Sequence, residues 1–101
     1  MVKHIVMWKL KDFAEGASRE ENARKLKAKL EALEGTIPEL QKAEVGINFD
    51  ASPAAYDVVL YSEFADRDAL RAYQRHPEHQ RLISEFLDKV RIDKKVVDYE
   101  V

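Results

Sequence analysis

Apolar and polar residues alternate with a period of two near the start of the chain, in residues 3–11 (KHIVMWKLK). One face of the predicted strand carries four residues, His4, Val6, Trp8 and Leu10. The other face carries Ile5 and Met7, so the centre of the strand is apolar on both sides. A strand covered on one side only has polar residues on its second face, and this strand is therefore expected to be covered twice.

The following segment changes to helical periodicity. Ser18 with Glu21 three residues later forms a capping box, which predicts the start of a helix. An apolar stripe follows at spacings of three and four, made of Ala23, Leu26, Leu30 and Leu33. Gly35, with Pro38 after it, is the expected C-terminal stop.

The second half of the chain repeats this order. Alternation predicts strands over residues 42–49 and 56–64, with a loop over 50–55 between them. Asp66 is the expected cap of a second helix, which Pro77 should interrupt at His76 before a new helical segment begins at the proline. The stripe of that segment is Leu82, Ile83, Phe86 and Val90. A last strand is expected over residues 92–99, with Ile92 and Val96 on one face and Val97 and Tyr99 on the other.

The predicted order is strand, helix, strand, strand, helix, strand. It indicates an α+β fold of the ferredoxin-like βαββαβ type, a four-stranded antiparallel sheet with its helices on one face. Residues 1–101 are expected to form one such domain. Helices can cover only one face of this sheet, yet several strands are apolar on both faces. A second copy of the sheet is the simplest cover, so we expect a homodimer formed through the sheet faces, a dimeric α/β barrel. A single sheet with a few tolerated exposed aromatic residues is the alternative.

Composition narrows the possible functions. The chain has 17 Lys and Arg against 19 Asp and Glu, a net charge of −2, and no Cys. The lack of a basic excess argues against nucleic-acid binding, and YDVVLYSEF lacks the glycines and leading basic residue of an RNA-recognition strand. No apolar run is long enough for a membrane span and none resembles a signal peptide, so a cytoplasmic protein without a membrane partner is expected.

Candidate chemistry concentrates around Pro77, in the segment AYQRHPEHQ. Tyr73, His76 and His79 recur every three residues there, and His4 lies on the first strand beside Trp8. Histidine transfers protons near neutral pH, and a Tyr hydroxyl can polarise a carbonyl group. The alternatives are that His76 bonds the last carbonyls of its helix and that Tyr73 and His79 merely pack under the sheet. The spacing of His76 and His79 is not a metal-binding H-E-x-x-H pattern and no third ligand is evident, so no metal site is expected.

The opening K-H-I-V-x-x-K-x-K and the segment Y-x-x-H-P-x-H resemble the stress-responsive α/β-barrel (Dabb) family over essentially the whole chain. The resemblance implies a dimeric ferredoxin-like barrel. A plant member of the family closes a linear polyketide by aldol chemistry with a Tyr and a His, which Tyr73 and His79 match. His4 matches a further pocket residue, whereas Val58 stands where that cyclase has another histidine. The family is also similar to small cofactor-free monooxygenases, but no motif in this chain supports that activity.

We therefore expect a small homodimer without a cofactor that binds a small apolar or aromatic molecule between its sheet and its helices. His79 and Tyr73 are the candidate catalytic residues, His79 as base and Tyr73 as hydrogen-bond donor. The expected ligand-binding residues are His4, Val6, Trp8 and Phe86. Two alternatives stay open, a cofactor-free cyclase or lyase using His79 and Tyr73, and a structural, stress-protective oligomer.

Overall fold

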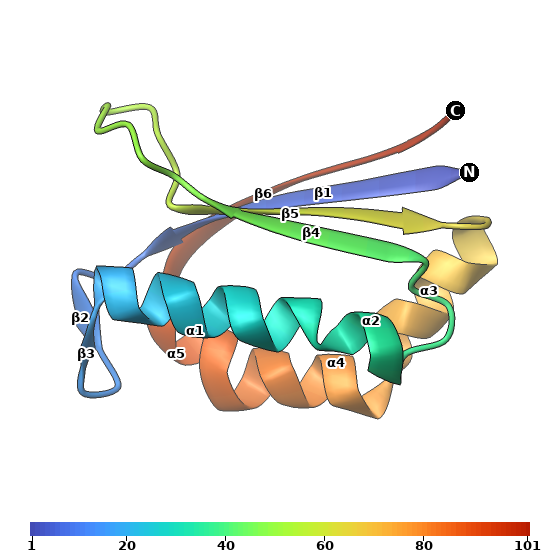
Figure 1. Cartoon of the computed structure of the whole chain (residues 1–101), viewed down its shortest axis with the longest axis horizontal. Helices are drawn as coiled ribbons and strands as arrows, with labels where there is room; N and C mark the ends of the chain where they lie inside the picture. Colours follow the sequence, from blue (N-terminus) through green and yellow to red (C-terminus); the bar gives the residue numbers. More distant parts are fainter.

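A four-stranded antiparallel sheet lies against a layer of helices in the computed structural model, which describes residues 1–101 (Figure 1). The strands of this sheet are β1 (Val2–Leu10), β4 (Lys42–Ile47), β5 (Val58–Phe64) and β6 (Arg91–Glu100), in the order β4-β5-β1-β6. The helical layer consists of α1 (Arg19–Glu31), α2 (Leu33–Thr36), α3 (Arg67–Arg75), α4 (Pro77–Leu82), the π-helix η1 (Ile83–Leu87) and α5 (Asp88–Val90). All helices lie on one side of the sheet, so the predicted ferredoxin-like α+β fold is confirmed.

The two faces of β1 behave as the alternation predicts. His4, Val6, Trp8 and Leu10 are buried against the helices. The neighbouring strands keep the same register, because Val6 pairs with Leu60 on β5 and with Val96 on β6. The stripe of α1 meets this face, and Ala23, Leu26, Leu30 and Leu33 are all buried. The core therefore lies between the inner face of the sheet and α1.

The start of α1 is as predicted and its end is not. The Ser18 hydroxyl accepts a hydrogen bond from the Glu21 backbone N–H at 3.2 Å. The expected stop at Gly35 is wrong, because α2 continues through Gly35 to Thr36. The chain becomes extended at Ile37 instead, and this residue precedes Pro38. The proline ring excludes helical backbone at the preceding residue, which explains the later end.

A short hairpin before α1 was not predicted. It consists of β2 (Phe13–Ala14) and β3 (Ala17–Ser18), joined by Glu15 and Gly16. Both turn residues have positive φ angles, 52° and 73°. A two-residue turn of this kind requires left-handed backbone at both positions, which is why Gly16 occupies the second.

The helical break at Pro77 is confirmed, and His76 takes part in it. His76 ends α3 and caps α4, because its ring Nδ1 accepts a hydrogen bond from the Glu78 N–H at 3.1 Å. The His76 side chain therefore does not bond the last carbonyls of its helix, and only its backbone N–H bonds the Tyr73 oxygen of α3, at 3.2 Å. The following π-helix η1 adds a residue to the turn. Consequently Leu87 is buried, whereas Leu82, Ile83 and Phe86 of the predicted stripe are only half-buried.

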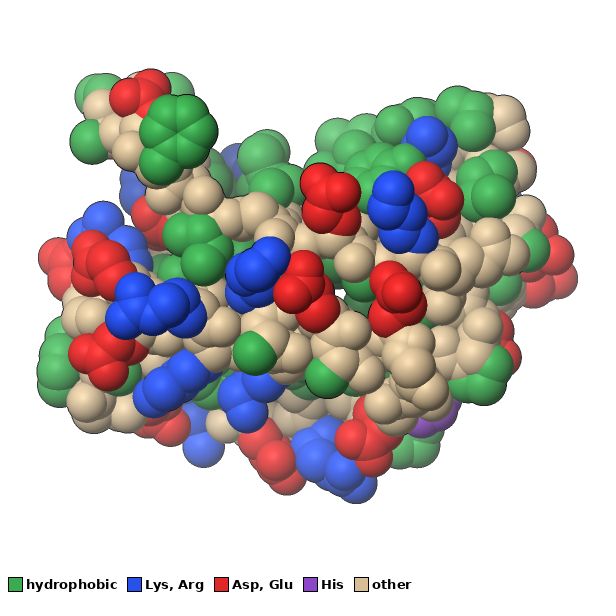
Figure 2. Space-filling view, in the orientation of Figure 1, with side chains coloured by type: hydrophobic (Ala, Val, Ile, Leu, Met, Phe, Trp, Pro, Cys, Tyr) green, Lys and Arg blue, Asp and Glu red, His purple; other side chains and the backbone are tan.

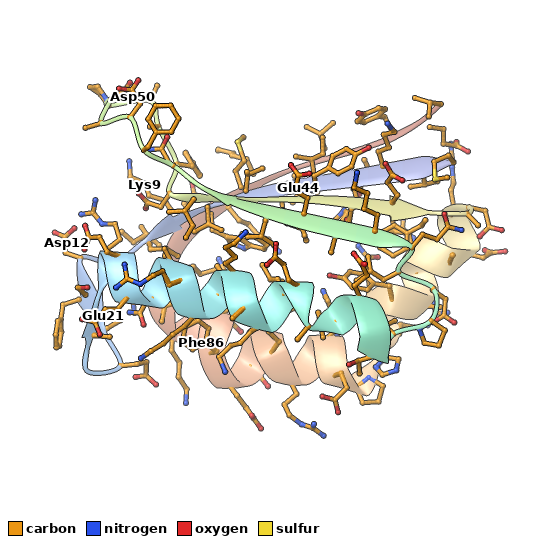
Figure 3. All side chains as sticks on the ribbon, viewed as in Figure 1. Lys9, Asp12, Glu21, Glu44, Asp50 and Phe86 are labelled. Atoms are coloured by element: carbon orange, nitrogen blue, oxygen red, sulfur yellow. The ribbon has the colours of Figure 1, made fainter.

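All four strands differ from the predicted ranges by one or two residues at an end. β1 covers Val2–Leu10 instead of 3–11, β5 begins at Val58 instead of residue 56, and β6 covers Arg91–Glu100 instead of 92–99. β4 stops at Ile47 rather than at residue 49, and the chain then projects as an arm whose Phe49 is completely exposed (Figures 1 and 2). Figure 3 shows Asp50 at the tip of this arm. On β6, Asp93 pairs with Lys9 and Arg91 pairs with Leu10, so Ile92 is an extra, bulged residue. The bulge breaks the alternation, and Ile92 does not share the inner face with Val96 as predicted.

The outer face of the sheet has no helix over it. Figure 2 shows hydrophobic side chains gathered along this side. Pairing across the strands places six apolar or aromatic residues there, Ile5, Met7, Val59, Tyr61, Val97 and Tyr99, which we call the open face. No helix of the protein has the length and hydrophobicity that crossing a membrane requires.

Candidate functional site

A cavity of about 150 Å³ lies between the inner face of the sheet and the helices α4 and η1. Most of its wall is apolar and is formed by Val6, Trp8, Leu30, Leu60, Leu82 and Ile83. His4, Tyr73, Gln74 and His79 supply its polar groups, and Asp88, Arg91 and Lys94 also border it. A cavity of this volume accommodates a molecule about the size of benzene.

The proline break directs His79 toward this cavity. α4 begins at Pro77, which suits the first helical position because its missing N–H needs no partner there. Two residues later, the ring Nδ1 of His79 lies 3.2 Å from the backbone oxygen of Gln74. A carbonyl oxygen only accepts, so Nδ1 carries the proton of the neutral ring and Nε2 keeps its lone pair.

The environment of His79 favours the neutral ring. Burial lowers the pKa of His79, and the neighbouring charges of His4, Lys94 and His76 lower it further, against the raising effect of the hydrogen bond to Gln74. At neutral pH the ring is therefore a hydrogen-bond acceptor or a base at Nε2.

Tyr73 lies beside His79, with ring centroids 4.5 Å apart. It comes from the last turn of α3 and is almost completely buried, with its ring 5.0 Å from that of Phe64. Burial raises the pKa of the Tyr73 hydroxyl well above its usual value near 10. Tyr73 therefore remains protonated and acts as a donor.

His4 is held by a carboxylate from the far end of the chain. Its ring Nδ1 bonds the Asp98 carboxylate, and its backbone oxygen accepts from the Ser62 hydroxyl at 2.8 Å. A carboxylate accepts from Nδ1–H, so Nε2 of His4 is free of this pair. The His4 ring lies 6.4 Å from that of Tyr73, centroid to centroid, which brings both histidines to Tyr73.

Trp8 presents an unsatisfied donor at the same place. It lines the cavity and is only 4% exposed, yet its indole N–H has no hydrogen-bond partner in the protein. An unsatisfied buried donor costs about 1–3 kcal/mol, so most such groups in proteins are paired. This group therefore requires an acceptor that the chain itself does not supply.

The structure brings five of the six sequence-predicted site residues to this cavity, His4, Val6, Trp8, Tyr73 and His79. Phe86 does not line it. This side chain is half-buried on another side of η1, packed against the core, and Lys29 lies 5.2 Å from its ring centroid (Figure 3). No three side chains of His, Cys, Asp or Glu come together in a group that could hold a metal ion.

Sequence reasoning did not select Asp98 or Lys94. Both share the inner face of β6 with Val96, since they pair with His4 and Trp8 respectively. Their spacing of two from Val96 is a signal that could have placed them there. Which β1 residue each of them meets depends on the register between β6 and β1, two strands that are distant in the sequence.

Comparisons with known proteins agree with this fold. The sequence profile of the Stress Responsive A/B Barrel Domain family matches residues 2–101. An uncharacterized protein of Streptomyces coelicolor is 39% identical over 83 residues, which are 79% of this chain and 80% of that protein. A dimeric protein of unknown function from Bacteroides fragilis with a ferredoxin-like fold is 35% identical, with a TM-score of 0.80 over 99% of this chain and 95% of its own. The hydroxynitrile lyase of Passiflora edulis shares the fold at 20% identity, with a TM-score of 0.77 over 99% and 92% of the two chains.

Proposed function

The chain belongs to the Stress Responsive A/B Barrel Domain (Dabb) family, and from this premise we propose that it is a homodimer that binds a small apolar or aromatic molecule in the cavity between sheet and helices. The observation that carries the binding proposal is the cavity itself, with apolar walls, the unpaired indole N–H of Trp8 and the lone pair of His79. A purely structural oligomer has no need for such a cavity, because filling it would stabilise the fold.

Self-association is supported by the open face. Met7, Val97 and Tyr99 are 40–58% exposed there, because no other part of the chain covers this side of the sheet. Soluble monomers rarely expose a contiguous apolar patch of this kind. The relative from Bacteroides fragilis is described as dimeric, and we propose that two copies of this chain pack their open faces together.

A test of binding can use Trp8, the only tryptophan in the chain, as its reporter. We expect benzyl alcohol, a neutral molecule with one aromatic ring, to change its fluorescence saturably. Val96→Phe should abolish this fluorescence change. Val96 borders the cavity from a half-exposed position on the edge strand β6, and the ring of a phenylalanine there would fill the cavity.

The matched control is Ile92→Phe, which adds a ring on the same strand outside the cavity. This variant should bind like the wild type. A wild-type protein whose fluorescence saturates with no single-ring compound, neutral or charged, while calorimetry also detects no heat, would contradict the binding proposal.

A second candidate function is cofactor-free acid–base catalysis, as in a lyase or a polyketide cyclase. It is favoured by the pairing of a neutral His79, whose Nε2 can take a proton, with a protonated Tyr73. Val58 stands on β5 where the plant cyclase has a histidine, and it does not line the cavity, which weakens the case for the same cyclisation.

Mandelonitrile offers a direct assay of this second function. His79 Nε2 would take the hydroxyl proton, the bond to the nitrile carbon would break, and benzaldehyde and cyanide would leave, with Tyr73 donating to the oxygen. We expect His79→Gln to abolish benzaldehyde release while keeping affinity within about twofold. If the wild-type protein releases benzaldehyde no faster than buffer alone, the enzymatic function is contradicted and the binding function is unaffected.

A further inference from the structure

We infer that the cavity selects ligands with an anionic head, a carboxylate on a single-ring or similarly small apolar body, and that Lys94 is the counter-ion. This inference rests on the proposed binding function and names its ligand class. It is carried by the balance of charges and of hydrogen-bond donors around the cavity.

The charges at the mouth of the cavity do not cancel. Arg91 and Asp88 neutralise each other, because the Arg91 guanidinium Nε lies 3.2 Å from an Asp88 carboxylate oxygen. Lys94 borders the same cavity and makes no ion pair with an acidic side chain of the chain. The two acids on the inner face of β6 already have partners in the chain, Asp98 in His4 and Glu100 in Arg67. One positive charge is therefore left without a partner beside the cavity.

The position of this charge is set by β6. Lys94 pairs with Trp8 across the sheet and thus lies on the same face as the indole. Lys94 and His79 both border the cavity, and the charge of Lys94 helps to lower the pKa of His79. The next residue, Lys95, pairs with Met7 on the outer face, and its ammonium lies 3.8 Å from Asp93.

The neutral groups also favour an acceptor-rich ligand. Trp8 offers an indole N–H that no protein atom accepts, and the protonated Tyr73 offers a hydroxyl. A carboxylate has two oxygens and only accepts hydrogen bonds, so it can satisfy donors of this kind together with the ammonium of Lys94. The cavity of about 150 Å³ limits the rest of the molecule to about one ring.

The experiment compares benzoate with benzamide, which has nearly the same shape and no charge. Each is titrated into the full-length protein at low salt and neutral pH, with Trp8 fluorescence and calorimetry as readouts. We expect benzoate to bind at least about fivefold more tightly than benzamide, the factor of a favourable partly exposed ion pair. This preference should shrink in about 0.5 M salt, where the screening length falls to a few ångströms.

Lys94→Gln should reduce the preference to about one, and Lys94→Glu should reverse it. Lys95→Gln is the matched control, because it removes the same charge from the adjacent residue on the opposite face, and it should keep the wild-type preference. Both positions are exposed, so the fold is expected to tolerate these changes, which circular dichroism checks.

Each outcome decides between the two proposals. Equal affinity for benzoate and benzamide in the wild type overturns the anionic ligand class and leaves the binding function intact. A preference that survives in Lys94→Gln overturns the role of Lys94. Failure of both compounds to bind overturns the proposed binding function and this inference with it.

Discussion

Replacing Val97 with Asp is expected to dissociate the proposed dimer without unfolding the single chain. Val97 lies on the open face next to Ile5 and is 58% exposed. Full burial of an apolar side chain contributes about 1.5–3 kcal/mol, so covering the exposed part of Val97 contributes about 1–1.5 kcal/mol in each copy. Because a two-fold dimer contains the substitution in both copies, this loss of binding free energy counts twice.

The substitution also places a carboxylate in the interface. Enclosing an unpaired charge costs several kcal/mol in a protein interior, and two such charges enter each dimer. Together with the lost apolar contact, about 4 kcal/mol or more should be lost, which raises the dissociation constant at least about thousandfold. The single chain already exposes most of Val97, so its free energy of unfolding should change little.

Size-exclusion chromatography with light scattering at micromolar concentration measures this effect. The wild type should have twice the mass of one chain and Val97→Asp the mass of one. Phe13→Asp is the control, since Phe13 is even more exposed, at 69%, but lies in the β2–β3 hairpin away from the open face. A Val97→Asp protein that remains dimeric, or a Phe13→Asp protein that dissociates, would refute the assignment of the interface to the open face.

Four further predictions concern the stability and the geometry of the single chain. Because the pKa of His79 is lowered, the unfolded chain binds more protons than the folded one between that value and about 6.5, so stability should fall as the pH drops through this range. Urea unfolding at pH about 7.5 and about 5.5 should show a smaller difference for His79→Gln than for the wild type, and an equal difference would contradict the burial of a neutral ring. Leu26→Ala should lower the free energy of unfolding by about 2–5 kcal/mol because Leu26 is completely buried, and a loss below about 1 kcal/mol would show a loosely packed core. Ser18→Ala should cost about 1 kcal/mol through the loss of the helix cap, measured by the same unfolding curves. Pro77→Ala should leave the fold intact but move the His79 ring, and unchanged His79 ring resonances in an NMR spectrum would show that the proline does not orient it.

Local patterns in the sequence determine most of the fold. The alternation in β1 assigns His4, Val6 and Trp8 to the buried face, because successive side chains of a strand point to opposite sides. Ser18 and Asp66 mark the starts of the two long helices, since each side chain accepts from a free N–H of the first turn. Such signals act within a few residues, and the chain order of the elements then leaves few topologies that an antiparallel sheet can adopt.

Part of the site follows from the same local rules. A proline inside a helix breaks or kinks it, so Tyr73 and His79 were expected on either side of a bend at Pro77. In the structure their rings lie together at the cavity. His4 could be placed on the inner face by counting along β1. The sequence therefore predicts which element carries each of these three residues and the face of the strand that holds His4.

The remaining features depend on register and on the contacts of the whole fold. Asp98 meets His4 from 94 positions away because β6 pairs with β1 in one particular register, and the bulge at Ile92 sets how that strand continues. Phe86 was expected at the cavity from its helical spacing, but it lies in the π-helix η1 and does not line the cavity. The tertiary structure alone decides these contacts, because cross-strand register and an extra residue in a helical turn are stabilised by packing between distant segments rather than by the residues next to them in the sequence.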